Sequence, residues 1–240
     1  MEQLLKELTS RLRSQYGQRL VSVVLYGSAA DGSGEKEFSD LNILCVLDHV
    51  DAKALAASEP VFRWWRENKQ PAPLLMSVEE VRASTDCFPI EFQDMRDRRR
   101  VLEGRDIVSE LIIDFSFHRA QVEHELRTNV LKLRQQATPL LSKPADLLRL
   151  CAAALSTFCV LGRHALLLSG VRVNPRKREI IESLRGKLGR DFSAFETLLA
   201  VREGKPTGQD RDALALFDAY VSEIQSIAVF VDKLEMGDSL

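Results

Sequence analysis

A glycine-serine turn is the first feature of this sequence that could do chemistry. Gly27 and Ser28 end an apolar, β-branched run over residues 19–26, so they should close a buried strand and open a short helix. Backbone amides at the start of a helix favour an anion. Together with the Ser28 hydroxyl, these amides are expected to form a phosphate-binding turn, called the cradle below. Gly32 allows the chain to bend back after the turn.

Two polar residues begin the next apolar run, which covers residues 40–47. Side chains alternate along a strand, so Asp40 and Asn42 should share one face. A magnesium-bound nucleoside triphosphate would sit between the cradle and this strand, because Mg²⁺ prefers oxygen ligands and keeps substrate phosphates in its shell. Taken singly, each feature also has a simpler interpretation: a plain strand-to-helix connection for Gly27 and Ser28, and a strand cap for Asp40.

This combination resembles the DNA polymerase beta-like nucleotidyltransferase superfamily, and the resemblance covers residues 15–105. The family signature is an apolar residue, Gly-Ser, a spacer and two acids one residue apart on a strand, with a third acid on a later strand between apolar residues. The matching positions are Leu25-Tyr26-Gly27-Ser28, Ala30, Gly32, Ser39-Asp40-Leu41 and Ile90-Glu91-Phe92. The resemblance implies magnesium-dependent transfer of a nucleoside monophosphate to an acceptor hydroxyl. It also implies that Asp40 and Glu91 are catalytic and that Asp40, Asn42 and Glu91 hold the metal.

One position departs from the signature. Asn42 stands where the family has its second acid, so one of the three charges that a two-metal site uses is missing. Asp48 cannot replace it, because six residues along a strand span about 20 Å. Glu35 and Glu37 lie in the loop before the strand and could swing in. Two functions therefore stay open: an active transferase, or a degenerate module that binds nucleotide or regulates a partner.

The periodicity predicts an α+β, mixed-sheet nucleotidyltransferase domain over residues 1–106 and an all-α helical bundle over 107–240. Strands are expected at 19–26, 40–47, 73–76 and 87–92, and helices at 2–16, 52–67 with a break near Pro60, and 77–84. Helical spacing then continues from residue 106, with further long helices at 145–169 and 210–234 and one after Asn174-Pro175. The sequence contains no internal repeat.

The helical half resembles the HEPN-type domains that accompany minimal nucleotidyltransferases, through the segment from Gly162 to Gly170 and the proline-started helix after it. Some of those domains are ribonucleases that use an Arg followed at short spacing by a His. Arg119 and His124 have this spacing, although solvent-facing helix positions are the simpler interpretation, as they are for Arg163 and His164. A ribonuclease is therefore the third and weakest functional alternative.

Composition and charge narrow the remaining classes of function and location. Among 240 residues, 33 basic and 35 acidic side chains give a net charge of -2, which predicts no bulk affinity for nucleic acid or membrane. The charged N-terminus is unlike a secretory signal, the apolar run at 150–161 is too short to span a bilayer, and the cysteines form no metal-binding pairs. We expect a cytoplasmic protein with a nucleoside triphosphate and an unidentified acceptor as partners; the oligomeric state, homo-oligomer included, stays open.

Two further groups have two interpretations each. A basic run could grip phosphates or could form a solvated helix or loop face; its members are Arg96, Arg98, Arg99, Arg100 and Arg105. Trp64 and Trp65 could stack on a base, but one ring facing the core and one facing the surface is the simpler arrangement.

Overall fold

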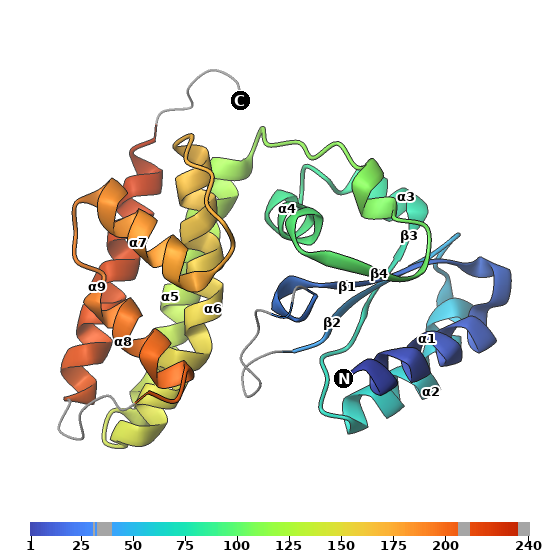
Figure 1. The fold of residues 1–240 in the computed structure, drawn as a ribbon, viewed down its shortest axis with the longest axis horizontal. Coiled ribbons are helices and arrows are strands. Elements are labelled where there is room, and N and C mark those ends of the chain that lie inside the picture. Colours follow the sequence, from blue (N-terminus) through green and yellow to red (C-terminus); the bar gives the residue numbers. More distant parts are fainter. Residues whose placement is uncertain (31, 33–39, 206–211, 235–240) are drawn as a thin grey trace. The chain divides into compact units, whose positions relative to one another are not determined.

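The computed structural model describes residues 1–30, 32, 40–205 and 212–234 of the chain, in two compact units, Met1–Phe115 and Ser116–Leu240 (Figure 1). The first unit combines a mixed β-sheet with helices, and the second consists of helices in its described part. The α+β class with a separate helical region, expected from the sequence, is confirmed.

The sheet of the first unit has four strands in the order β3-β2-β1-β4. Strand β1 runs antiparallel to both β2 and β4, whereas β2 and β3 are parallel. The central strands are apolar on both faces, since a layer of helices covers each side. The strand bounds are β1 Leu20–Tyr26, β2 Asn42–Leu47, β3 Leu74–Ser77 and β4 Arg99–Gly104.

Helices α1 (Glu2–Tyr16) and α2 (Ala52–Glu67) cover one face of the sheet, and α3 (Val78–Ala83) and α4 (Pro89–Asp97) lie on the other (Figure 1). Helix α3 begins with a capping box, in which Ser77 and Glu80 exchange hydrogen bonds. Pro60 causes no break in α2, where it lies in an exposed position inside a continuous helix.

The prediction of a strand at residues 87–92 is wrong, because helix α4 begins at Pro89 within this segment. Pro89 occupies the first turn of the helix, where a missing amide costs nothing, and Phe92 and Met95 are buried at helical spacing. The fourth strand is instead β4, formed from the basic run and paired with β1. Strand β4 begins with two arginines and lacks the apolar pattern that identified the other strands. The short apolar run at residues 87–92 therefore resembles a fourth strand more closely than β4 does.

The first unit extends past residue 106, where the sequence places the domain boundary. A short 3₁₀ segment, η3 (Ile107–Glu110), follows β4, and helix α5 begins only at His118. Leu111, expected near the start of a long helix, instead completes the core beneath α3 and α4 together with Ile107, Val108 and Ile113.

The second unit is built around three long helices, α5, α6 and α9, which contact one another, with the shorter α7 and α8 packed against them (Figure 1). Its helix bounds are α5 His118–Ala137, α6 Pro144–Leu168, α7 Lys177–Leu188, α8 Ser193–Arg202 and α9 Ala213–Asp232. Helix α8 was not expected from the sequence. Single 3₁₀ turns complete the described elements: η1 Gly17–Arg19, η2 Gly27–Ala29 and η4 Thr138–Leu140.

Length and composition alone would allow two described helices, α6 and α9, to cross a membrane. The central helices of a soluble bundle meet the same criterion. Most of the apolar stretch of α6 is buried inside the helical unit, so its hydrophobicity is accounted for by the core.

Candidate functional site

The glycine-serine turn closes β1 and forms a single short turn of 3₁₀ helix after it. Gly27 has φ +78°, in the region that favours glycine, and its carbonyl accepts a hydrogen bond from the Ala30 amide at 3.0 Å. The turn is the three-residue η2. Gly32 also has a positive φ, +73°, in keeping with the expected bend, while its neighbours at 31 and 33–39 lie outside the described residues.

The backbone amide of Gly27 already has a partner. It donates to the carbonyl oxygen of Arg98 at 3.0 Å, which ties the turn to the segment just before β4. This amide is therefore not one of the donors that the turn could offer to an anion, and the phosphate site itself stays a prediction. A phosphate at the turn would have to use other donors, of which the Ser28 hydroxyl is the side-chain candidate.

Asn42 lies next to the turn. It is the first residue of β2 and pairs with Tyr26, the last residue of β1. A β-carbon added to Gly27 would lie 3.4 Å from the side-chain nitrogen of Asn42. The absence of a side chain at Gly27 thus leaves room beside the Asn42 amide.

Asp40 precedes β2 and is exposed. The intervening Leu41 is buried in the core under α1 and α2, and its amide donates to the side-chain oxygen of Gln70 at 3.0 Å. This fixes how the chain enters β2. Asp40 and Leu41 precede β2, which begins at Asn42, so a shared face for Asp40 and Asn42 stays a prediction.

Glu91 lies on the exposed face of α4 and not on a strand. Burial raises the pKa of Tyr26 to about 12, and the negative charge of Glu91 adds to the rise. Glu91 is therefore near enough to Tyr26, the residue that pairs with Asn42, for its charge to act on the phenol. Tyr26, which the sequence identifies only as part of the matching motif, is a further candidate residue at this strand end.

The acidic groups do not form a ready-made metal cage. Within the described ranges, no group of three His, Cys, Asp or Glu side chains is arranged to hold a metal ion. Asp40 and Glu91 come from the start of β2 and from α4, with the uncharged Asn42 near Gly27. Glu35 and Glu37, the candidate replacements, lie outside the described residues.

Much of the basic run is bound to acids of the same unit. Arg99 donates to both carboxylate oxygens of Asp106, at 2.7–3.0 Å. Arg100 pairs with Glu2 at 3.0 Å. These ion pairs make the run part of the β4 framework, which disfavours the phosphate-gripping interpretation.

The tryptophans follow the simpler interpretation. Trp65 is fully buried and its indole nitrogen donates to the carbonyl oxygen of Pro71 at 2.8 Å. Trp64 is partly exposed, with the guanidinium of Arg11 4.3 Å from its ring centre. Both rings thus have structural partners.

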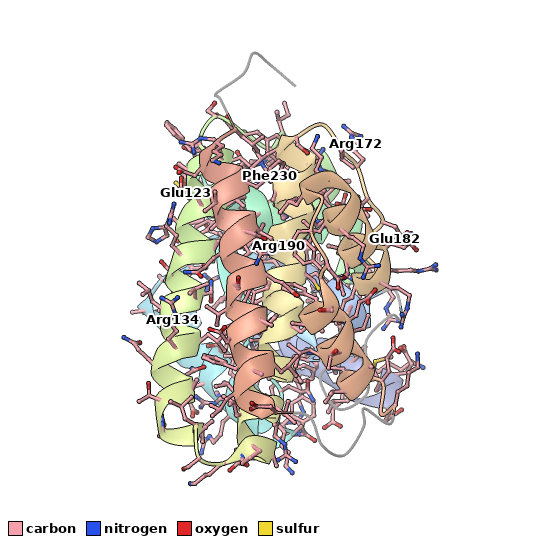
Figure 2. The ribbon with its side chains drawn as sticks, turned by 90° about the vertical axis from the view of Figure 1, so that its left-hand side faces the viewer. Glu123, Arg134, Arg172, Glu182, Arg190 and Phe230 are labelled. Atoms are coloured by element: carbon pink, nitrogen blue, oxygen red, sulfur yellow. The ribbon has the colours of Figure 1, made fainter. Side chains whose placement is uncertain are left out.

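Among the described residues, Arg119 and His124 of the helical unit each contact a partner other than one another. Arg119 of α5 donates to Glu123, whereas His124 is exposed and contacts Thr128. Figure 2 shows Glu123 on the surface of this helix.

Arg163 and His164 are buried, so their expected place on the surface is wrong. The Nδ1 atom of His164 lies 2.8 Å from the Nε2 atom of His118, a pairing across 46 sequence positions that no local pattern indicates.

Comparisons with known proteins show similarity at the level of structure. No family model and no curated sequence matches the chain. A structure of spectinomycin adenyltransferase AAD(9) from Enterococcus faecialis with ATP and spectinomycin superposes with a TM-score of 0.60 and 13% identity, over 97% of this chain and 100% of that chain. A mutant of the toxin-antitoxin MntA-HpeT and a toxin-antitoxin with AMP-PNP each give a TM-score of 0.31 and 19% identity, over 44% of this chain and 77% of theirs. The chain therefore has the fold of a solved nucleotidyltransferase.

Proposed function

We propose that this chain is a nucleotidyltransferase that binds a nucleoside triphosphate between the Gly27-Ser28 turn and the Asp40-Asn42 strand end. The observation that carries the proposal is the approach of Asn42 to Gly27, which joins the ends of two adjacent strands beside a position without a side chain. The fold shared with an adenyltransferase that was solved with ATP supports it.

The proposed reaction transfers a nucleoside monophosphate. An acceptor hydroxyl oxygen attacks the α-phosphorus, and the bond from that phosphorus to the oxygen bridging to the β-phosphate breaks. The electron pair leaves with pyrophosphate. Glu91 is the proposed base for the acceptor proton, since it is exposed on α4 and near enough to Tyr26 for its charge to act there.

The proposed site would hold one magnesium ion carried by the nucleotide. Mg²⁺ commonly takes one or two carboxylates, substrate phosphates and water, and Asp40 with the amide oxygen of Asn42 could supply the protein ligands. When bound, the ion would neutralise phosphate charge. The described residues offer no three-acid set for a further ion, so this chain relies more on Asp40 than a three-carboxylate site would.

Spectinomycin is the first acceptor to test, because the structural neighbour was solved with it. Purified protein would be given each nucleoside triphosphate with magnesium, with and without spectinomycin, and pyrophosphate release would be followed. Asp40→Asn should abolish release, whereas Asp48→Asn, at the opposite end of β2, should leave it unchanged. Equal release by the parent and Asp40→Asn would overturn the proposal.

A second candidate is a regulatory module that binds nucleotide without turnover. The uncharged Asn42 specifically favours it, because the missing charge weakens any metal held at the strand end. Calorimetry separates the two functions. Magnesium-dependent triphosphate binding without pyrophosphate release, for every acceptor class tested, would identify the module.

The helical unit is proposed to be of the HEPN type and the protein to be cytosolic. The first proposal is supported by the segment that resembled this type, which forms the end of α6 and the turn leading to α7. The second is supported by the four cysteines, which all lie among the described residues and form no disulfide.

A further inference from the structure

Helix α8 begins without a side-chain cap of its own. Its N-cap residue, Phe192, makes no capping hydrogen bond. Glu223 of α9 takes over this role, because its two carboxylate oxygens accept hydrogen bonds from the amides of Ala194 at 3.0 Å and Phe195 at 3.1 Å. Only 4% of Glu223 is exposed. A buried carboxyl group therefore clamps the first turn of α8 to α9.

The surroundings of Glu223 contain several titratable or charged groups. Tyr220 lies one turn earlier on α9, fully buried, and its hydroxyl has no hydrogen-bond partner among the described residues. The groups near Glu223 or Tyr220 from neighbouring elements are Arg190 and Asp191 before α8, Arg202 of α8, and Cys151 and Cys159 of α6.

Arg190 lies against α9 (Figure 2), where its guanidinium donates to the hydroxyl of Ser222 at 2.7 Å. Burial raises the pKa of Glu223 to about 7, even though the two backbone hydrogen bonds and the charge of Arg190 act to lower it. Desolvation outweighs the hydrogen bonds because this carboxylate is inside the helical unit.

We propose that Glu223 is a proton-operated clamp between α8 and α9. An ionised carboxylate offers acceptors to both amides, whereas a protonated one keeps a single good acceptor and must donate its own hydrogen. Protonation therefore replaces a two-amide cap by a one-amide cap. The switch lies in the helical unit and does not depend on the function proposed for the first unit.

The direction of the stability change follows from the raised pKa. The folded protein holds this proton at pH values where an unfolded chain, with an ordinary value of 4.5, has released it. The contribution of Glu223 to stability is therefore greatest at pH values below its ordinary pKa, falls as the pH rises towards 7, and is constant above that. Glu223→Gln should remove this slope.

Nuclear magnetic resonance of the full chain can test the clamp. The Glu223 carboxyl carbon and the amides of Ala194 and Phe195 should titrate together with a midpoint near pH 7. Glu223→Gln should abolish the amide titration, and Glu182→Gln, an exposed control on α7 labelled in Figure 2, should leave it unchanged.

Two results would overturn the inference: a Glu223 midpoint near 4.5, or amide shifts at Ala194 and Phe195 that do not follow the carboxyl carbon. Should Glu223→Gln fail to fold, the carboxyl and amide signals of the parent protein still decide the matter.

Discussion

The side-chain nitrogen of Asn42 lies 3.4 Å from the point where a β-carbon on Gly27 would be. A β-branched side chain at residue 27 would therefore crowd the amide and the proposed phosphate position. Gly27→Val should lose triphosphate affinity in calorimetry. It should also lose about 1–2 kcal/mol of stability, because the backbone there has φ +78°.

Gly17→Val provides the matched control. Gly17 also has a positive φ, +54°, but a β-carbon there would meet nothing within 4 Å. This variant should lose comparable stability and keep its triphosphate affinity. A Gly27→Val protein that folds and binds as tightly as the parent would place the phosphate site elsewhere.

Asn42→Asp should increase the response of the protein to magnesium. The change puts a second carboxylate next to Asp40 on the strand end, so the metal-free variant should lose about 1 kcal/mol through repulsion of like charges. Bound magnesium should restore that loss. The measurement is the melting temperature of parent and variant, with chelator and with millimolar magnesium, at constant ionic strength.

Gln15→Glu is the control for Asn42→Asp, since it makes the same amide-to-carboxylate change at an exposed position on α1. Its response to magnesium should match that of the parent. If Asn42→Asp also behaves like the parent, residue 42 does not face a metal site, and the proposed roles of Asp40 and Glu91 lose their support.

Asp106→Asn should weaken the link between β4 and the segment after it. The hydrogen bonds from Arg99 lower the pKa of Asp106, so its stabilising effect is present above the ordinary carboxyl pKa and is lost as the pH falls through the lowered value. The pair is partly exposed, so we expect about 1 kcal/mol. Denaturation at neutral and strongly acidic pH should show a difference between parent and variant only at neutral pH.

Asp48→Asn is the control for this ion pair, because Asp48 bonds to Arg19 with more of its side chain exposed. It should cost less stability than Asp106→Asn. Equal losses in the two variants would mean that the Arg99–Asp106 pair has no special role at β4.

Truncation should distinguish residue 106 from residue 115 as the end of the first unit. Burial of each apolar side chain contributes roughly 1.5–3 kcal/mol to the free energy of unfolding. Four such buried side chains lie between residues 106 and 115: Ile107, Val108, Leu111 and Ile113. A fragment of residues 1–106 should be loosened or aggregate, whereas 1–115 should unfold cooperatively. Circular dichroism and analytical gel filtration would compare them, and equally stable monomeric fragments would contradict this expectation.

The parts of the fold that local patterns encode were predictable. Strands β1 and β2 are β-branched apolar runs, and the Ser77–Glu80 capping box marks the start of α3. The segment at 87–92 was misassigned because a short apolar run does not distinguish a strand from a buried helix. Only pairing with β1 reveals β4, whose arginines are neutralised by acids from other elements.

The candidate site was predictable in its residues more than in its geometry. Gly27 and Asn42 were identified from spacing, and the structure brings them together. The partner of the Gly27 amide could not be predicted, because Arg98 is distant in sequence and approaches only once β4 pairs with β1. The buried Glu223 was likewise hidden, since nothing in its local sequence shows that it caps another helix.

The hydrogen bond from the Gly27 amide to Arg98 makes that amide a built-in reporter. Its proton can exchange with solvent only when the end of the β1–β4 pairing opens, so its exchange rate measures the fraying of that sheet edge. A nucleotide held by the neighbouring Ser28 should slow this exchange by reducing the opening of the strand pairing, because the Gly27 amide already donates to Arg98 and does not contact the nucleotide. The exchange rate of the Gly27 amide, measured with and without nucleotide, would therefore report both nucleotide binding at the turn and the opening of the β1–β4 pairing.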